Sequence, residues 1–469
     1  MIIFIVGCYF LIPLLVVAFS VEIPISSLPV QQQQHQHPTI IEVPRMSVSE
    51  FTTYWQKLHS DQQYKNSNHS RYYDFPLLTP ILVTGALTSQ QCEVICSQFI
   101  ETAHNDTSIY VDLQRRRTIK SIEKVQSNRR RSSSSAAAAR RQRSRRANNC
   151  RSELRSLYNV SLVHAIDTIM MQSKHNDAFW CFQEGLLEEH SVFESIHNML
   201  QSIRQSLLQK GTNSSDDRIQ GQDSPQQLLF TNWFDYFPKW AQSTDCVILS
   251  GVGSTSTLHR DPFEWTGTSI CVEGTKIWRF IGPNPNIQQI DAMMQSYRLP
   301  SIAWNVNTSI SAGWQSDFSL YRNIHLTNDS KSNGAGSMVP PATTTRDEKY
   351  REILNMAQSF DDLQPDHDLL VTSNWTSTDV WTTVQQEGDF LIIPSHYWHQ
   401  TYTIVEPTVT ISSQHCSDFD IYRVLNHIVT TTNRTHLFDV EDLVRQLYSD
   451  DHPQQRMQQF FHKLEETLK

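Results

Sequence analysis

The sequence predicts an α+β protein in which a strand-rich core is flanked by helices and interrupted by long disordered insertions. Short apolar runs bounded by turn residues, such as Phe390–Ile393, are typical of buried strands. Helical periodicity occurs on both sides of residues 246–416. Polar stretches of low complexity separate the folded parts, and they explain a hydrophobic fraction of only 39% in 469 residues.

Residues 1–20 are predicted to form a signal peptide. Ile2 to Phe19 are apolar and uncharged, and the sequence Ala18-Phe19-Ser20 resembles a small-x-small cleavage site. The alternative is an uncleaved signal anchor in the membrane, because an apolar run of this length can just span a bilayer. Both interpretations place the body of the chain in the lumen of the secretory pathway, in the ER or Golgi, or outside the cell.

The number of glycosylation signals agrees with this compartment. Asn-x-Ser/Thr sequons mark acceptor sites in proteins that pass through the secretory lumen. The chain has eight of them, at Asn68, Asn105, Asn159, Asn213, Asn307, Asn328, Asn374 and Asn433. We therefore expect a glycoprotein.

Residues 21–70 are predicted to be a flexible leader, since they include the solvated Gln and His tract at 31–37. The folded domain is expected to begin in residues 71–112. There the extended segment Pro80–Gly85 precedes a helical pattern from Thr88 to Glu101.

Residues 113–150 are predicted to be a disordered basic insertion. Between Arg115 and Arg146 there are thirteen basic residues against one acidic residue, together with Ser and Ala runs. A sharper interpretation is proteolytic processing, because Arg143-Ser144-Arg145-Arg146 matches the Arg-x-Arg-Arg pattern of secretory convertases. Charge alone would also suit nucleic acid, but luminal placement argues against such a partner.

The remaining chain divides into three parts. Residues 151–245 are predicted to give helical support, residues 246–416 the barrel core with an insertion at about 284–380, and residues 417–469 C-terminal helices. The helical patterns lie at Ser152–Met171, at Ser191–Leu208, and in two amphipathic segments split near Asp451-His452-Pro453.

The most informative motif is Leu258-His259-Arg260-Asp261-Pro262. Side chains alternate faces along a strand, so His259 and Asp261 are expected to point the same way. A neutral imidazole and a carboxylate then converge on one point without backbone strain. A third metal ligand has to come from another strand.

A second motif supplies that ligand. The apolar run Phe390–Ile393 follows a Gly-Asp turn signal and ends at a proline, which predicts a buried strand. His399 lies just beyond it, and His396 competes with it from three residues earlier. Two imidazoles and one carboxylate bind one face of an iron(II) ion and leave the opposite face open for chemistry.

Lys276 is a candidate anion-binding residue. Read as a strand, the segment around it places Lys276, Trp278 and Phe280 on one face, which suits a cation inside an apolar barrel. The alternative is an ordinary lysine whose stem covers apolar surface. Glu273-Gly274 resembles the tip of a hairpin, so Cys271 is expected opposite Lys276 across a ladder.

These motifs resemble the cupin-like JmjC oxygenases, which use Fe(II), 2-oxoglutarate and O2. The resemblance covers residues 246–416 densely and implies a double-stranded β-helix, the jelly-roll barrel of that family. It implies that His259, Asp261 and His399 bind iron, and the pattern of two aromatic residues before the histidine favours His399 over His396. It also implies that Lys276 pairs with the far carboxylate of 2-oxoglutarate.

Two further positions follow from the resemblance. Ser256 falls where the family places a hydroxyl beside the same carboxylate, and Ser412 falls near a similar threonine. Two departures stand out: Ser269 occupies a position where some relatives have asparagine, and the gap between the two motifs is longer than in compact members.

The function expected from this resemblance is an Fe(II)- and 2-oxoglutarate-dependent dioxygenase, a hydroxylase that acts on a protein side chain in the secretory pathway. A homodimer formed through the C-terminal helices is expected as well. The alternatives are a catalytically silent cupin-like binding protein, and a cupin that uses another metal on a small metabolite or glycan.

Overall fold

The computed structural model divides into a short unit, residues 1–36, and a main unit, residues 37–469. It describes residues 40–66, 79–117, 155–171, 177–208, 232–239, 241–256, 258–261, 264–282, 314–315, 345–359, 380–395, 397–403, 405–418, 420–432, 434–449 and 452–468. The expected signal peptide, the Arg143–Arg146 pattern and most of the basic insertion lie outside these residues. None of the helices within them is both long enough and apolar enough to traverse a bilayer.

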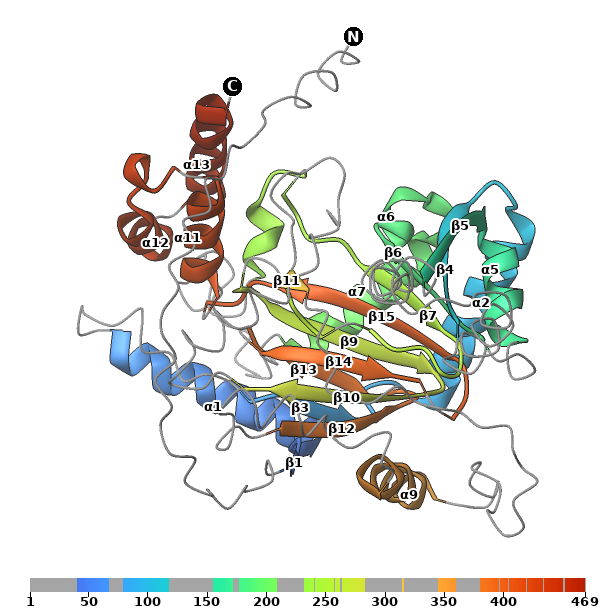
Figure 1. Cartoon of the computed structure of the whole chain (residues 1–469). Coiled ribbons are helices and arrows are strands. Elements are labelled where there is room, and N and C mark those ends of the chain that lie inside the picture. The colour runs from blue at the N-terminus through green and yellow to red at the C-terminus, as the bar shows by residue number, and fades with distance from the viewer. Residues whose placement is uncertain are drawn as a thin grey trace, which may run out of the picture. The chain divides into compact units, whose positions relative to one another are not determined.

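The fold is mixed α+β and is built on two large sheets (Figure 1). In spatial order, the nine-stranded sheet contains β2 (Arg45–Ser47), β3 (Ile81–Thr84), β13 (Phe390–Ile393), β9 (Thr266–Glu273), β15 (Thr408–His415), β7 (Cys246–Ser250), β6 (Asp177–Glu184), β4 (Tyr110–Arg117) and β5 (Arg155–Ser161). The six-stranded sheet contains β1 (Ile40–Glu42), β12 (Val380–Gln386), β10 (Thr275–Ile281), β14 (Trp398–Tyr402), β8 (His259–Arg260) and β11 (Trp314–Gln315). Pairing is antiparallel except for β1–β12 and β2–β3.

The chain passes repeatedly from one sheet to the other. Strands β7, β9, β13 and β15 belong to the nine-stranded sheet, whereas β8, β10, β12 and β14 belong to the six-stranded sheet. Each central sheet therefore interleaves early and late strands, in the orders β13-β9-β15-β7 and β12-β10-β14-β8. Residues that are far apart in sequence, such as His259 and His399, become neighbours through this arrangement.

Gly274 makes one of these passages, between β9 and β10. Its φ is +83°, and a Cβ at this position would lie 2.2 Å from the backbone oxygen of Pro407, so only glycine fits. The expectation that Cys271 and Lys276 face each other across a hairpin ladder was wrong, because β9 and β10 lie in different sheets. A glycine turn can join two strands of one hairpin, and it can equally join two strands that lie in different sheets.

Strand β13 shows how the two faces of the nine-stranded sheet differ. Phe390 and Ile392 join the core beneath the helices, while Leu391 and Ile393 join the core that includes Trp278. The expected buried strand at Phe390–Ile393 is confirmed. Its alternating side chains are buried on both faces, as its unbroken apolar sequence requires.

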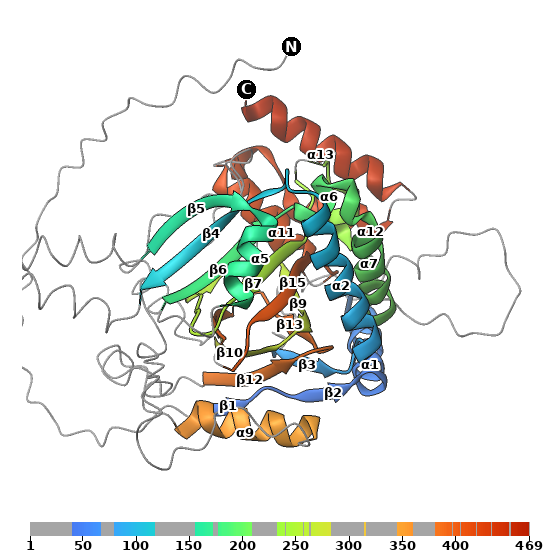
Figure 2. The same ribbon diagram turned by 90° about the vertical axis from the view of Figure 1, so that its right-hand side faces the viewer.

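Helices cover one face of the nine-stranded sheet (Figure 2). They are α1 (Val48–Asn66), α2 (Ser89–Asn105), α5 (Leu162–Met170), α6 (Leu186–Glu189) and α7 (Glu194–Leu208), with the 3-10 turn η2 (Ser191–Phe193). The expected helices at Thr88–Glu101 and Ser191–Leu208 are confirmed, and Thr88 is the N-cap of α2. The expected helix at Ser152–Met171 is only partly correct, because Arg155–Ser161 is strand β5.

The predicted flexible leader, residues 21–70, forms strands and a helix in residues 40–66. Residues 40–66 contain β1, β2 and α1, and Phe51 and Trp55 of α1 are buried in the core. The indole of Trp55 donates a 3.1 Å hydrogen bond to the backbone oxygen of Leu208, the last residue of α7. Strand β4 likewise extends to Arg117, into the range expected for the basic insertion.

The C-terminal helices form a separate core. Helices α11 (Ile421–Thr431), α12 (Val440–Ser449) and α13 (Pro453–Leu468) pack on the turn η4 (Trp233–Tyr236) and on Trp265. The short turn η7 (Thr435–Leu437) joins the first two of these helices. The expected split of the C-terminal tail near Pro453 is confirmed. Within the long insertion, the described residues form β11 and helix α9 (Arg346–Ser359), and α9 packs beside β12.

Candidate active site

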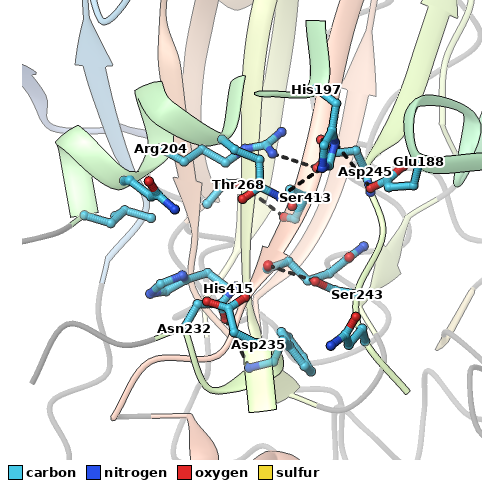
Figure 3. Close-up of a pocket in the computed structure, with 16 residues that line it drawn as sticks. Glu188, His197, Arg204, Asn232, Asp235, Ser243, Asp245, Thr268, Ser413 and His415 are labelled. Carbon is cyan, nitrogen blue, oxygen red and sulfur yellow. Dashed lines mark hydrogen bonds and ion pairs between the residues drawn. The ribbon is translucent and has the colours of Figure 1, made fainter. Parts of the chain in front are cut away.

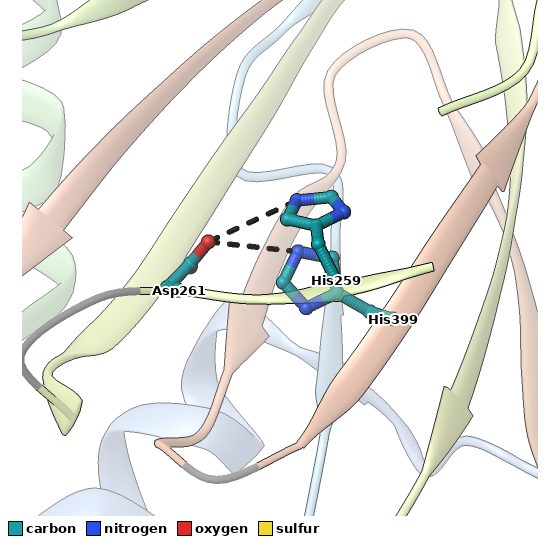
Figure 4. A group of neighbouring side chains, drawn as sticks. All are labelled: His259, Asp261 and His399. Carbon is teal, nitrogen blue, oxygen red and sulfur yellow. Dashed lines mark ion pairs between the residues drawn. The ribbon is translucent and has the colours of Figure 1, made fainter. Parts of the chain in front are cut away.

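The side chains of His259, Asp261 and His399 converge on one point (Figure 4). Asp261 Oδ1 lies 3.9 Å from His259 Nε2 and 3.7 Å from His399 Nε2. Ligand atoms that share one ion at about 2.1 Å lie about 3.0 to 3.4 Å apart, so only small side-chain adjustments are needed. The three atoms lie close enough together that they could hold one metal ion, and the two motifs meet as the sequence predicted.

The two histidines are fixed by strand pairing. His259 of β8 and His399 of β14 are antiparallel register partners, and their ring centroids lie 4.2 Å apart. His399 Nδ1 lies 3.2 Å from the backbone oxygen of Tyr397. A proton on Nδ1 that is donated to this oxygen leaves Nε2 bare and turned toward Asp261.

Burial keeps His399 in the neutral form that a metal ligand requires. The side chain is 4% exposed, and desolvation, with the neighbouring His259, lowers the pKa of His399 to about 4. The Asp261 side chain is 29% exposed, so the site opens toward solvent on the carboxylate side. His396, the alternative ligand, lies outside the described residues.

Gly267 makes room for the Asp261 carboxylate. A Cβ on this residue of β9 would lie 2.9 Å from Asp261 Oδ2 and 3.3 Å from Ile393 Cβ. Any larger side chain would push the carboxylate away from the two imidazoles. The sequence gives no sign of this role, because a glycine inside a strand reveals nothing about which strand passes in front of it.

Lys276 lies inside the protein, as expected, with 1% of its surface exposed. Its Nζ donates a 2.9 Å hydrogen bond to Thr410 Oγ1 and lies 5.5 Å from the centroid of the Trp278 ring. Desolvation lowers the pKa of this ammonium group from 10.5 to about 8. Among the described residues, no carboxylate forms an ion pair with Lys276.

Trp278 connects the ammonium group to the metal-ligand cluster. Its ring centroid lies 5.9 Å from that of His399, so Lys276 and His399 both adjoin one indole. The indole nitrogen donates a 2.9 Å hydrogen bond to Gln385 Oε1, and Gln385 Nε2 donates 2.8 Å to the backbone oxygen of Ser269. Gln385, which sequence reasoning missed, thereby ties the aromatic wall of β10 to β9 in the opposite sheet.

The two predicted serines have different surroundings. Ser256 Oγ accepts a 2.9 Å hydrogen bond from the backbone nitrogen of Thr401, beside the ligand strand β14. Ser412 lies two residues beyond Thr410, so both face the same side of β15. The hydroxyl bonded to Lys276 belongs to Thr410, and a cofactor role for Ser256 or Ser412 stays a prediction.

Comparison with known proteins adds no assignment to this geometry. No protein-family model matches the chain, and no curated protein matches it significantly.

Proposed function

We propose that the chain is an Fe(II)- and 2-oxoglutarate-dependent dioxygenase. The observation that carries the proposal is the convergence of His259 and His399 on Asp261. The Nε2 atoms of both histidines lie within 3.9 Å of Asp261 Oδ1. Two neutral imidazoles and one carboxylate on one side of an ion are the ligand set of non-haem iron oxygenases, which keep open positions for co-substrate and O2.

The strand order supports a double-stranded β-helix, the finer fold that we propose. Eight strands from β7 to β15, without β11, divide into two four-stranded layers, β13-β9-β15-β7 and β12-β10-β14-β8. In such a barrel the metal ligands sit on strands that face the interior between the layers. Here one ligand lies on β14, one on β8 and one immediately after β8.

Lys276 supports 2-oxoglutarate as the co-substrate. Within the described residues, the buried ammonium group of Lys276 donates a hydrogen bond to a neutral hydroxyl and forms no ion pair, so its desolvation is not offset by an opposite charge. A carboxylate from a ligand would supply that charge. Bound iron and 2-oxoglutarate would supply O2 activation, while Lys276 holds the far carboxylate and Trp278 and Phe280 exclude water.

The compartment and the substrate class are part of the same proposal. The apolar N-terminus and the sequons favour the secretory lumen, and the family resemblance favours hydroxylation of a protein side chain. Pairing of subunits through α11–α13 also remains a proposal. The oxygenated substrate can be sought by mass spectrometry, comparing the secreted proteome with and without this chain for the gain of one oxygen atom.

The test is uncoupled turnover. Purified full-length protein, supplied with Fe(II), ascorbate and 2-oxoglutarate under air, should release succinate and CO2 slowly without any substrate. His259→Ala should abolish this release by removing a ligand, and Lys276→Met should raise the concentration of 2-oxoglutarate required. Undiminished release by His259→Ala would refute the metal assignment.

The same measurements separate the alternatives. A cupin that uses another metal would bind a metal ion at His259, Asp261 and His399 without consuming 2-oxoglutarate. A silent binding protein would show no turnover under any metal. Both outcomes would reject the dioxygenase proposal.

A further inference from the structure

A second cluster of metal-ligating side chains lies outside the candidate active site. Glu188 of α6, His197 of α7 and Asp245, which immediately precedes β7, bring one ligand atom each within 4.8 Å of one another. We propose that these three residues bind a divalent transition-metal ion, with Zn²⁺ as the probe. This proposal does not depend on the dioxygenase function.

The distances between the atoms suit a shared ion. His197 Nδ1 lies 3.4 Å from Asp245 Oδ2 and 3.8 Å from Glu188 Oε1. Ligand atoms around tetrahedral zinc, each at about 2.0 Å from the metal, lie about 3.3 Å apart. An ion placed between the three atoms would therefore need little movement of the side chains.

Two of the three atoms that would bind the ion have no hydrogen-bond partner among the residues that the structure describes. They are Asp245 Oδ2 and His197 Nδ1, which are buried and face each other at 3.4 Å, and the Asp245 side chain is only 2% exposed. The other oxygen of Asp245 is occupied, since Arg204 Nη1 donates to it at 2.7 Å. Arg204 thus orients the carboxylate in the way that outer hydrogen bonds orient metal ligands.

The backbone holds the cluster together. The nitrogen of Asp245 donates a 2.6 Å hydrogen bond to Glu188 Oε1, and the nitrogen of Gly185 donates 2.9 Å to the oxygen of Asp245. Helix α6 is therefore fixed to the start of β7. On the far side of its ring, His197 Nε2 lies 3.3 Å from the amide nitrogen of Gln201. A turn of this amide that brings its oxygen to the ring would let Nε2–H donate and leave Nδ1 bare.

The cluster also has space for a water ligand. It borders a cavity of about 300 Å³ lined by Gln201 and His415, among others. Figure 3 shows His197, Glu188 and Asp245 gathered at one end of this pocket, with Arg204 reaching Asp245 from the side away from Glu188. One imidazole, two carboxylates and water form a ligand set that suits Zn²⁺.

The experiment first removes the candidate active site. In full-length protein with His259→Ala and Asp261→Ala, stripped by chelator and dialysed against Zn²⁺, metal analysis should find about one zinc per chain. Addition of His197→Gln should reduce this to background. His190→Gln, which removes the neighbouring histidine outside the cluster, should leave it unchanged.

A second variant guards against misfolding. Glu188→Gln removes a ligand from the partly exposed side of the cluster without stranding Arg204, and in protein with His259→Ala and Asp261→Ala it should reduce the zinc content from about one ion per chain to background. Glu189→Gln is the matched control. If the protein with His259→Ala and Asp261→Ala binds zinc and the addition of His197→Gln leaves the zinc content unchanged, the ion lies elsewhere. If the same protein is folded but binds no zinc, the cluster is a buried ion pair only. Both results would overturn the proposal without affecting the dioxygenase assignment.

Discussion

His259 and His399 are register partners across β8 and β14, and this pairing alone brings two imidazoles 140 residues apart in sequence within 4.2 Å, centroid to centroid. The separation between them is set by the spacing of paired strands rather than by a flexible loop. A register slip of one residue would turn one imidazole to the opposite face. The site is therefore as stable as the sheet that carries it.

Matched substitutions can decide whether His399 or His396 is the third metal ligand. We expect His399→Gln to lose stoichiometric iron, because its Nε2 lies 3.7 Å from Asp261 Oδ1. His396→Gln should retain iron. Metal analysis of both variants after anaerobic loading gives the answer. Loss of iron from His396→Gln alone would reverse the assignment.

Gly267→Ala should weaken iron binding by about 10- to 100-fold, the usual effect of disturbing the residues around a metal ligand. Its Cβ would lie 2.9 Å from Asp261 Oδ2 and would displace the carboxylate. Competition with a chelator measures the affinity, and thermal unfolding of the metal-free protein checks the fold. Unchanged affinity would show that Asp261 can bind the metal from a different position.

Lys276→Met should separate stability from co-substrate binding. Burial holds the pKa of Lys276 at about 8, below its ordinary 10.5, so the charged form at pH 7 costs on the order of 3 kcal/mol that the variant avoids. We expect equal or greater stability in urea denaturation. We also expect 2-oxoglutarate binding to weaken at least tenfold. A destabilised variant with normal 2-oxoglutarate affinity would contradict both expectations.

Titration of the Lys276 ammonium group should make 2-oxoglutarate binding depend on pH. In the metal-loaded wild-type protein, 2-oxoglutarate binding should weaken as the pH rises through about 8, because the free ammonium group loses its proton there. Between this pH and 10.5 the unfolded chain binds more protons than the folded chain, so the contribution of Lys276 to stability rises with pH. Calorimetric titration at several pH values measures the first effect. Lys276→Met provides the pH-independent control.

Gly274→Ala should destabilise the fold by more than about 4 kcal/mol, because its Cβ would lie 2.2 Å from the backbone oxygen of Pro407. Gly85→Ala is the matched control. Its φ is also positive, at +67°, but no atom lies within 4 Å of the added Cβ, so only the backbone cost of about 1 kcal/mol remains. Denaturant midpoints compare the two variants. Equal losses would show that the β9–β10 passage tolerates movement.

Local patterns predicted the parts of the fold that depend on local physics. Period-two alternation in the first motif placed His259 and Asp261 together, and the apolar run before the second motif gave β13. Helix α1 was missed although its signals are present. Ser47 and Glu50 form reciprocal capping hydrogen bonds at its start, and the buried Phe51 and Trp55 lie one turn apart.

Long-range pairing explains what the sequence did not reveal. The register of β15 shifts between Val409 and Thr410, an irregularity without a sequence signature. The hydroxyl that reaches Lys276 from this strand belongs to Thr410, and its approach depends on how the two sheets face each other. The carboxylate space at Gly267 and the bridging amide of Gln385 likewise depend on strands brought together from distant parts of the chain.

Strand β11 has a consequence for how this protein would change under selection. Trp314 pairs with Arg260, and Gln315 with His259, so a piece of the long insertion is paired with the very strand that carries His259, a candidate metal ligand. Variation in the length or composition of that insertion would be transmitted by the backbone itself to the proposed metal site. New substrate preferences and altered metal reactivity would then tend to arise together.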